Sequence, residues 1–206
     1  MAIITLVSCT KKDIESSACS IPQAGIFVAG EINGICRQFE SGIDAYIASP
    51  QPLGSTTDNI LNYRDTCFEL HGCYFIKDSG NTSGPMIMLS ITVPTSGMLC
   101  MDKSADDIQT GDYRYSESFF PMNLNETIIQ YSDSTGFYAS NYGKQDDNAY
   151  FKITRVEDTD SWDKAIGNPH YFKKVTGICS CKLFDTEKKL APVTFKDIAF
   201  CIYIFY

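Results

Sequence analysis

The alternation of polar and apolar residues along this chain limits it to a fold made of strands. The alternation has a period of two, β-branched and aromatic residues are frequent, and turn residues recur at short intervals. No long segment keeps the apolar stripe of an amphipathic helix. The 206-residue chain is therefore predicted to be all-β, as an antiparallel β-sandwich or, alternatively, as a closed or partly open up-and-down β-barrel.

Turn residues divide the chain into strands. Residues 25–32 and 35–40 flank Asn33 and Gly34, a pair that suits a two-residue hairpin turn because both positions tolerate a positive φ. The other expected strands are 68–76 and 86–93, which form a second hairpin, and then 112–116, 127–131, 136–141, 149–156, 171–184 and 193–206. Two segments differ. Residues 49–57, which contain two prolines, are predicted to form one long loop, and residues 160–166 indicate a helical turn with Asp160 as its N-cap.

Two strands near the carboxyl end are predicted to contribute much of the core. One face of residues 175–184 is expected to point inward, and it consists of Val175, Gly177, Cys179, Cys181 and Leu183. Residues 198–206 are apolar on both faces, which suits a strand that is covered on both sides. We therefore expect this last run to be central in the sheet or to pack on a partner.

The nine cysteines are many for a cytosolic protein of this length and are compatible with an oxidising compartment. Their spacing does not determine how they pair. Cys179 and Cys181 lie on one face of one strand, so we expect no bridge between them and predict that they act as small apolar core residues. Neither C-x₂-C spacing nor a mixed Cys and His cluster is present, so no metal ion is expected.

The amino terminus contains the motif of a bacterial lipoprotein. A short apolar run ends in Leu6-Val7-Ser8-Cys9, and polar residues follow. Signal peptidase cleaves before such a cysteine once its sulfur carries a diacylglycerol, and acyl chains on the cysteine then hold the protein at a membrane. We interpret the chain as three parts: a remnant of the signal peptide at 1–8, the lipidated Cys9 with a polar tether at 9–22, and a single domain at 23–206.

An alternative interpretation is that residues 3–7 form a first strand followed by an ordinary buried cysteine. No other segment has the run of apolar residues needed to span a bilayer, so the lipid anchor is the only membrane contact expected. The formal net charge is −8, and the sequence contains no stripe of clustered Lys and Arg residues. This charge argues against nucleic acid as a partner, because binding to phosphates depends on clustered Lys and Arg.

The sequence contains no recognisable catalytic constellation. The G-x-S-x-G motif is absent, and the only two histidines, His71 and His170, have no motif partners. Clustered carboxylates suit solvated loops better than a calcium site. We therefore expect no enzymatic activity and no cofactor. Tyr138, Tyr142 and Trp162 fall near predicted turns, and they are the candidate ligand-binding residues because exposed aromatic rings can stack on sugars.

Several strand and turn motifs accompany the lipobox. They are Phe27-x-Ala29-x-x-Ile32-Asn33-Gly34, Gly111-Asp112-Tyr113, Tyr150-Phe151-x-Ile153-Thr154 and Val175-Thr176-Gly177-x-x-Ser180-Cys181-x-Leu183-Phe184-Asp185. In this arrangement the chain resembles the small β-sheet lipoproteins of Bacteroidetes-type bacteria, which are mostly domains of unknown function. The resemblance implies no catalytic residues. It implies an outer-membrane location, with the cell surface and the periplasmic face both open.

These observations favour a lipid-anchored domain of the cell envelope that is not catalytic. It is expected to bind a glycan or a protein, or to take part in a surface assembly. One alternative is a β-barrel carrier of a small apolar ligand, suggested by alternating strands with abundant Phe and Ile. Another is a pilus-type subunit, because the doubly apolar terminal strand could be donated to a neighbour.

Overall fold

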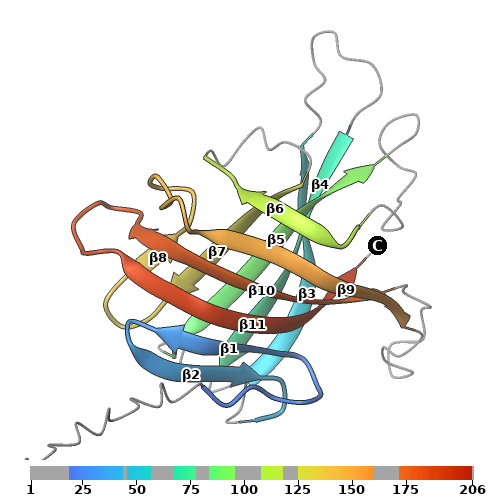
Figure 1. Cartoon of the computed structure of the whole chain (residues 1–206), viewed down its shortest axis with the longest axis horizontal. Coiled ribbons are helices and arrows are strands. Elements are labelled where there is room, and N and C mark those ends of the chain that lie inside the picture. Colours follow the sequence, from blue (N-terminus) through green and yellow to red (C-terminus); the bar gives the residue numbers. More distant parts are fainter. Residues whose placement is uncertain are drawn as a thin grey trace, which may run out of the picture.

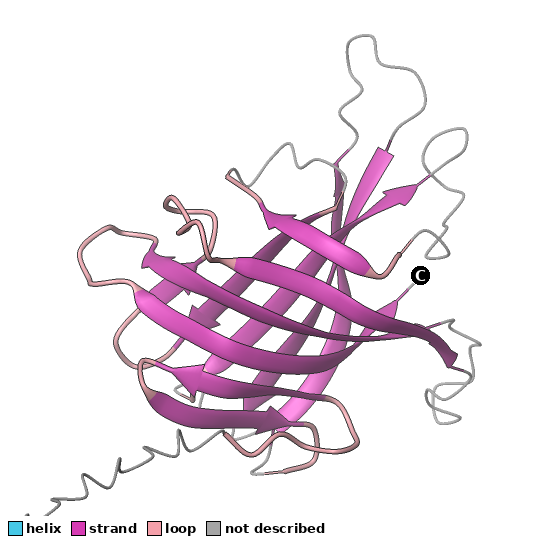
Figure 2. Cartoon of the chain, viewed as in Figure 1, coloured by secondary structure: helices cyan, strands magenta, loops and turns pink. Residues whose placement is uncertain are grey.

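Nearly all regular structure in this chain is β-sheet. A computed structural model describes residues 19–43, 46–56, 67–77, 84–95, 108–117, 125–159 and 172–205. Strands make up most of the described residues, and no helix occurs among them (Figure 2). The all-β prediction is confirmed. The strands are β1 (Phe27–Ile32), β2 (Ile35–Glu40), β3 (Tyr46–Thr56), β4 (Cys67–Lys77), β5 (Met86–Thr95), β6 (Gly111–Tyr115), β7 (Glu126–Ser132), β8 (Phe137–Ala139), β9 (Tyr150–Thr159), β10 (Phe172–Asp185) and β11 (Val193–Phe205).

The strands form one sheet that closes on itself in its middle part. Their order is β2-β1-β11-β10-β9-β6-β7-β5-β4-β3, and the short β8 pairs with both β7 and β10. Five strands, β6, β7, β8, β10 and β9, therefore make a closed barrel. The β6–β7 pair is parallel and the other pairs are antiparallel. This arrangement fits the barrel alternative of the sequence prediction.

The remaining strands extend the sheet and curve around a shared interior. On one side β1 and β2 continue from β11, and on the other β5, β4 and β3 continue from β7 (Figure 1). The two extensions meet again, because β3 and β4 both contact β11. Alternate side chains of most strands therefore point into one core, as the period-two pattern requires.

Large apolar side chains fill this interior. Phe75, Phe151, Phe195 and Phe200 are all fully buried. The rings of Phe151 and Phe200 are stacked with centroids 4.9 Å apart, so strands β9 and β11 are in contact across the intervening β10. Two buried threonine hydroxyls donate to the backbone of a neighbouring strand: Thr127 Oγ1 to the Ser90 carbonyl at 2.7 Å, and Thr92 Oγ1 to the Glu126 carbonyl at 3.1 Å. The core is thus built from aliphatic side chains and packed aromatic rings.

The two carboxyl-terminal strands have the predicted roles. The face of β10 that contains Val175, Cys179 and Leu183 is fully buried. Strand β11 is hydrogen-bonded to β1 on one edge and to β10 on the other, which places it centrally in the sheet. The expectation that the terminal apolar run is central is confirmed, and pairing on both edges protects it from aggregation.

One expected loop is a strand. Residues 49–57 were predicted as irregular because of Pro50 and Pro52, but β3 (Tyr46–Thr56) covers almost all of them. Proline lacks a backbone N–H and is tolerated where one side of a strand is unpaired. Strand β3 stands at the end of the sheet order, and its register against β4 shifts between Pro52 and Gly54. The edge position and the bulge thus accommodate both prolines. The predicted helical turn at 160–166 lies outside the described residues.

The first hairpin turns as predicted. Asn33 and Gly34 have φ values of 50° and 78°, the left-handed conformation that a two-residue hairpin turn needs. Asn33 also connects the hairpin to β11, because its Oδ1 accepts a hydrogen bond from the Thr194 N–H at 2.7 Å. The second predicted hairpin, β4 with β5, is present as an antiparallel pair.

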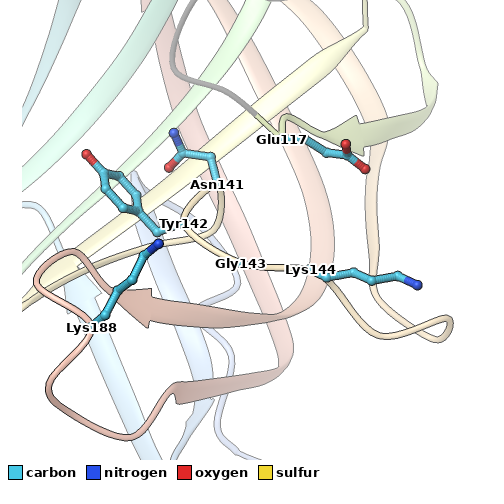
Figure 3. A pocket seen from close by; sticks show the side chains of 6 residues that line it. All are labelled: Glu117, Asn141, Tyr142, Gly143, Lys144 and Lys188. Atoms are coloured by element: carbon cyan, nitrogen blue, oxygen red, sulfur yellow. The ribbon is translucent and has the colours of Figure 1, made fainter.

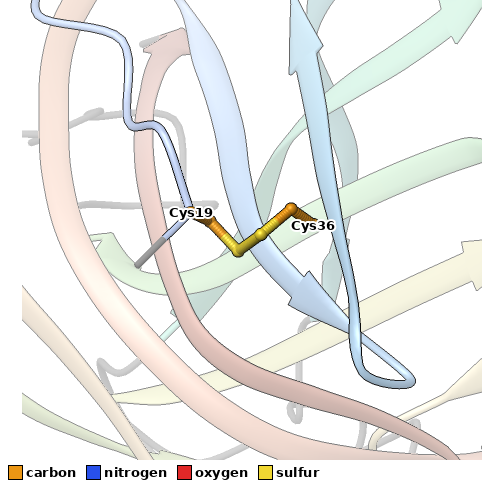
Figure 4. The surroundings of a disulfide bond; sticks show 2 residues. All are labelled: Cys19 and Cys36. Carbon is orange, nitrogen blue, oxygen red and sulfur yellow. A yellow bond between two sulfur atoms is a disulfide. The ribbon is translucent and has the colours of Figure 1, made fainter. Parts of the chain in front are cut away.

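A disulfide joins Cys19 to Cys36 of β2, with their Cα atoms 5.4 Å apart (Figure 4). It attaches the end of the segment predicted as a tether to the edge of the sheet. Four other cysteines are free and buried: Cys73, Cys179, Cys181 and Cys201. The predicted absence of a bridge between Cys179 and Cys181 is confirmed. Among the described residues, no helix has the length and apolar character required to cross a membrane.

Candidate functional site

The loop that connects β8 to β9 is fixed to the barrel by one amide side chain. Nε2 of Gln145 donates hydrogen bonds to the Ser140 carbonyl at 2.7 Å and to the Lys182 carbonyl at 2.8 Å. Its Oε1 accepts a hydrogen bond from the Lys182 N–H at 2.9 Å. Both ends of the amide are therefore satisfied, and they tie the loop to β10. A glutamate could not donate these bonds, so an amide is needed here.

The same loop lies flat on an aromatic ring. A Cβ atom added at Gly143 would lie 2.6 Å from carbons of the Phe184 ring, closer than any side chain can approach. Glycine is thus required at this position for the backbone to reach the ring. Lys182 and Asp146 add an ion pair at 2.8 Å on the other side of the loop. These contacts hold residues 140–146 in one conformation.

The turn between β10 and β11 is organised by a carboxylate. Asp185 accepts hydrogen bonds from the backbone N–H groups of Glu187, Lys189 and Leu190. Burial opposes the charged form, but these hydrogen bonds outweigh it and lower the pKa of Asp185. The turn places Lys188 in the left-handed region, at φ 58°. This turn conformation places Lys188 next to the β8–β9 loop.

A first pocket, of about 490 Å³, opens between the β8–β9 loop, the end of β6 and this turn. It is lined by Glu117, Asn141, Tyr142, Gly143, Lys144 and Lys188. Figure 3 shows the side chains of Asn141, Tyr142 and Lys188 on one side, with those of Glu117 and Lys144 on the other. The lining therefore combines an aromatic ring, an amide and charges of both signs.

Two side chains of this pocket have features that matter for binding. The Asn141 side chain is buried, with 8% of the residue exposed, yet within the described part of the chain its Oδ1 receives no hydrogen bond. A buried acceptor without a donor is costly, so a donor at this position would be stabilising. Tyr142 is 42% exposed, which leaves a large part of its ring open to solvent. The pocket thus offers an accessible ring, and the unused Asn141 acceptor lies buried behind its surface.

A second pocket, of about 380 Å³, lies on the other side of the same loop, at the start of β9 and next to the β10–β11 hairpin. Within it, Tyr150 Oη donates to Asp197 Oδ1 at 3.2 Å, and the Asp197 N–H donates to Ser180 Oγ at 2.8 Å. Asp197 has φ 50°, and the register of β10 against β11 shifts at Cys179/Cys181, close to it. The irregular pairing turns these polar groups outward.

The predicted site residues fall in different environments. Tyr142 lines the first pocket. Tyr138 was expected to be exposed, and this is wrong: it is 3% exposed, its ring packs beside Tyr131, and its hydroxyl is bonded to Thr135 Oγ1 at 2.9 Å. The reason is that β8 closes the barrel and turns this ring inward. Cys9 and Trp162 lie outside the described residues.

Other pocket residues were not found from sequence. Asn141 and Lys144 lie within two residues of Tyr142, the tyrosine that the sequence predicted. The glycine that follows it, Gly143, was the only signal that could have indicated a tight loop there. Glu117 and Lys188 come from distant segments, and no spacing rule connects them to this loop. Of the two histidines, His71 has its backbone in β4, while His170 lies outside the described residues.

The free cysteines that the structure describes are buried. Burial raises the pKa of the Cys73 thiol to about 12 and that of Cys181 to about 12, so both stay protonated and poorly nucleophilic at neutral pH. Burial also raises the pKa of Cys179 and Cys201. Within the part of the chain that the structure describes, no group of three or more His, Cys, Asp or Glu side chains could hold a metal ion.

No family model, curated protein or solved structure matches this chain. The resemblance to Bacteroidetes-type lipoproteins therefore stays a prediction from the motifs. The geometry of the two pockets is the basis for a functional proposal. Of the two, the first pocket combines the exposed ring of Tyr142 with charged side chains of both signs.

Proposed function

We propose that this protein is a non-catalytic, lipid-anchored domain of the bacterial outer membrane that binds a glycan or a protein through its first pocket. One observation carries the proposal: a rigid, polar pocket presents the open ring of Tyr142. The hydrogen bonds of Gln145 and the contact of Gly143 with Phe184 hold this loop before any ligand arrives. Preorganisation of this kind favours binding because less conformational entropy is lost.

The location is supported by the cysteines. The bridge between Cys19 and Cys36 is of the kind that persists in an oxidising compartment such as the bacterial periplasm or cell surface. It also lies just after the segment that the lipobox at Cys9 would anchor. An anchor followed by a bridged start of the domain is consistent with a protein held at a membrane surface.

The two alternatives from the sequence have less support. A carrier needs an inner cavity, but the described interior is occupied by rings such as Phe75, Phe151 and Phe200, and both pockets described above open to the surface. A pilus-type subunit would donate its last strand, but β11 is paired within its own sheet on both edges. Neither alternative is favoured by a specific contact.

Two experiments test the proposal. Labelling of cells with an alkyne fatty acid is expected to mark the wild-type protein and not Cys9→Ser, and the absence of label on both would remove the anchor. A glycan array and a crosslinking screen on intact cells then search for ligands, with Tyr142→Ala expected to abolish binding. Tyr142→Phe is the matched control, since it keeps the ring. Binding that survives Tyr142→Ala would exclude this pocket.

The non-catalytic part has its own test. The purified protein is offered ester, peptide and glycoside substrates, and we expect no turnover above the blank. Turnover that a single substitution in either pocket abolishes would contradict the proposal. Glu117→Gln in the first pocket, and Asp146→Asn and Asp197→Asn in the second, are the variants to use, because these are the carboxylates that line the two pockets and a glycoside hydrolase depends on carboxylates.

A further inference from the structure

We propose that the first pocket binds a sugar that carries a carboxylate group, an inference that rests on the binding function proposed above. The ligand class follows from three features of the lining: its charge, its free acceptors and its open ring. Each feature is provided by side chains that line the pocket, and together they favour an anionic and hydroxyl-rich molecule.

The charge of the pocket is opposite to that of the protein. Lys144 and Lys188 contribute two positive charges and Glu117 one negative charge, whereas the chain as a whole has a formal charge of −8. Within the described residues neither lysine forms an ion pair, although the neighbouring Lys189 pairs with Glu187 at 2.6 Å. Two lysines without partners beside a pocket on an acidic protein are suited to an anionic group.

The acceptors of the pocket call for hydroxyl donors. The Glu117 carboxylate belongs to the lining, on the side of the pocket opposite Asn141 and Tyr142 (Figure 3). Its oxygens accept hydrogen bonds and donate none when the group is charged. An acidic peptide side chain has a carboxylate but no hydroxyl to give them. A sugar acid has both, so the sugar fits better than a peptide.

The Tyr142 ring completes the match. It is 42% exposed at the side of the pocket, and the apolar face of a pyranose ring packs well on an aromatic ring of this kind. Lys188 lies on the same side of the pocket as Tyr142 in Figure 3, so it would be next to a sugar ring stacked on the tyrosine. A carboxylate on the bound sugar would therefore be placed among hydrogen-bond donors rather than acceptors.

The test measures binding of the purified full chain by isothermal titration calorimetry. The probes are oligosaccharides of glucuronic, galacturonic and N-acetylneuraminic acid, each matched with its methyl ester, which keeps the rings and removes the charge. We expect at least one acid to bind about tenfold more tightly than its ester, since charge-assisted hydrogen bonds are the stronger ones. Equal binding of every acid and its ester, or no binding of any acid, overturns the inference.

Variants separate this inference from the proposed function. Lys188→Gln and Lys144→Gln are expected to weaken binding of the acid more than binding of its ester, so that the tenfold preference for the acid is lost. Lys152→Gln, at an exposed lysine on β9 outside both pockets, is the matched control and should keep that preference. If neutral glycans or a protein bind and Tyr142→Ala abolishes that binding, the proposed function stands and the acidic ligand is wrong. If Tyr142→Ala leaves all binding intact, both are wrong.

Discussion

The disulfide between Cys19 and Cys36 should account for a measurable part of the stability of this domain. The two cysteines are 17 residues apart in sequence, so the bridge closes a loop of moderate length in the unfolded chain. The loss of chain entropy for such a loop corresponds to about 3 kcal/mol at room temperature. The double variant Cys19→Ser/Cys36→Ser is therefore expected to unfold about 3 kcal/mol more easily, which lowers Tm by about 6 to 12 °C for a domain of this size.

Guanidinium unfolding of the wild type and the double variant measures this difference, with the slope of the transition compared as well. The wild type in mild reductant is a second route to the same state, because Cys36 is exposed, whereas the four free cysteines that the structure describes are buried. Both routes should give the same midpoint. A difference below about 0.5 kcal/mol, with the bridge verified by mass spectrometry, would refute the entropic reasoning, because the closed loop would then not restrict the unfolded chain enough to affect stability.

Three further outcomes are expected. Gly177→Ala should destabilise the domain by about 1 to 3 kcal/mol in chemical unfolding, because the added Cβ would clash with the backbone carbonyl oxygen of Lys152 and with Cζ of Phe200 in the core. An unchanged midpoint would show that both the strand backbone and the ring can move. The pKa of Asp185 is lower in the folded protein than in the unfolded chain, so its charged form stabilises the fold at pH values above the unfolded-state pKa. This stability is lost as the pH falls through the folded-state pKa. The wild type should therefore lose more stability than Asp185→Asn below about pH 4. Iodoacetamide at pH 8 should not label Cys73 or Cys181 in the folded protein, because burial raises the pKa of both thiols to about 12. Rapid labelling detected by mass spectrometry would contradict their burial.

Local sequence rules predicted the parts of the fold in which one segment determines its own structure. Asn33 and Gly34 have the conformation that their chemistry favours, and alternation along β10 identified its buried face correctly. The rules failed at β3, where a sheet edge tolerates prolines that would break a central strand. Propensity cannot show which strand will be at an edge, because that depends on the pairing of the whole sheet.

The candidate site was predictable only in part. Tyr142 was found because it lies near a turn, but the same argument chose Tyr138, which the closure of the barrel buries. Glu117 and Lys188 are brought to the pocket by strands far apart in the chain, through pairings that include the parallel contact of β6 with β7. No pattern within either segment records these pairings, and a site assembled from three loops leaves no local signature.

The three-residue strand β8 connects recognition to the integrity of the barrel. It pairs with both β7 and β10, and the pocket loop begins directly after it. If these few hydrogen bonds broke, β7 and β10 would separate at this point of the barrel. Asn141 and Tyr142, which follow β8, would then be displaced together. A ligand bound in the pocket would therefore stabilise the closed barrel by mass action and suppress this local opening. Amide hydrogen exchange would then slow more in β8 than in the distant β1–β2 hairpin.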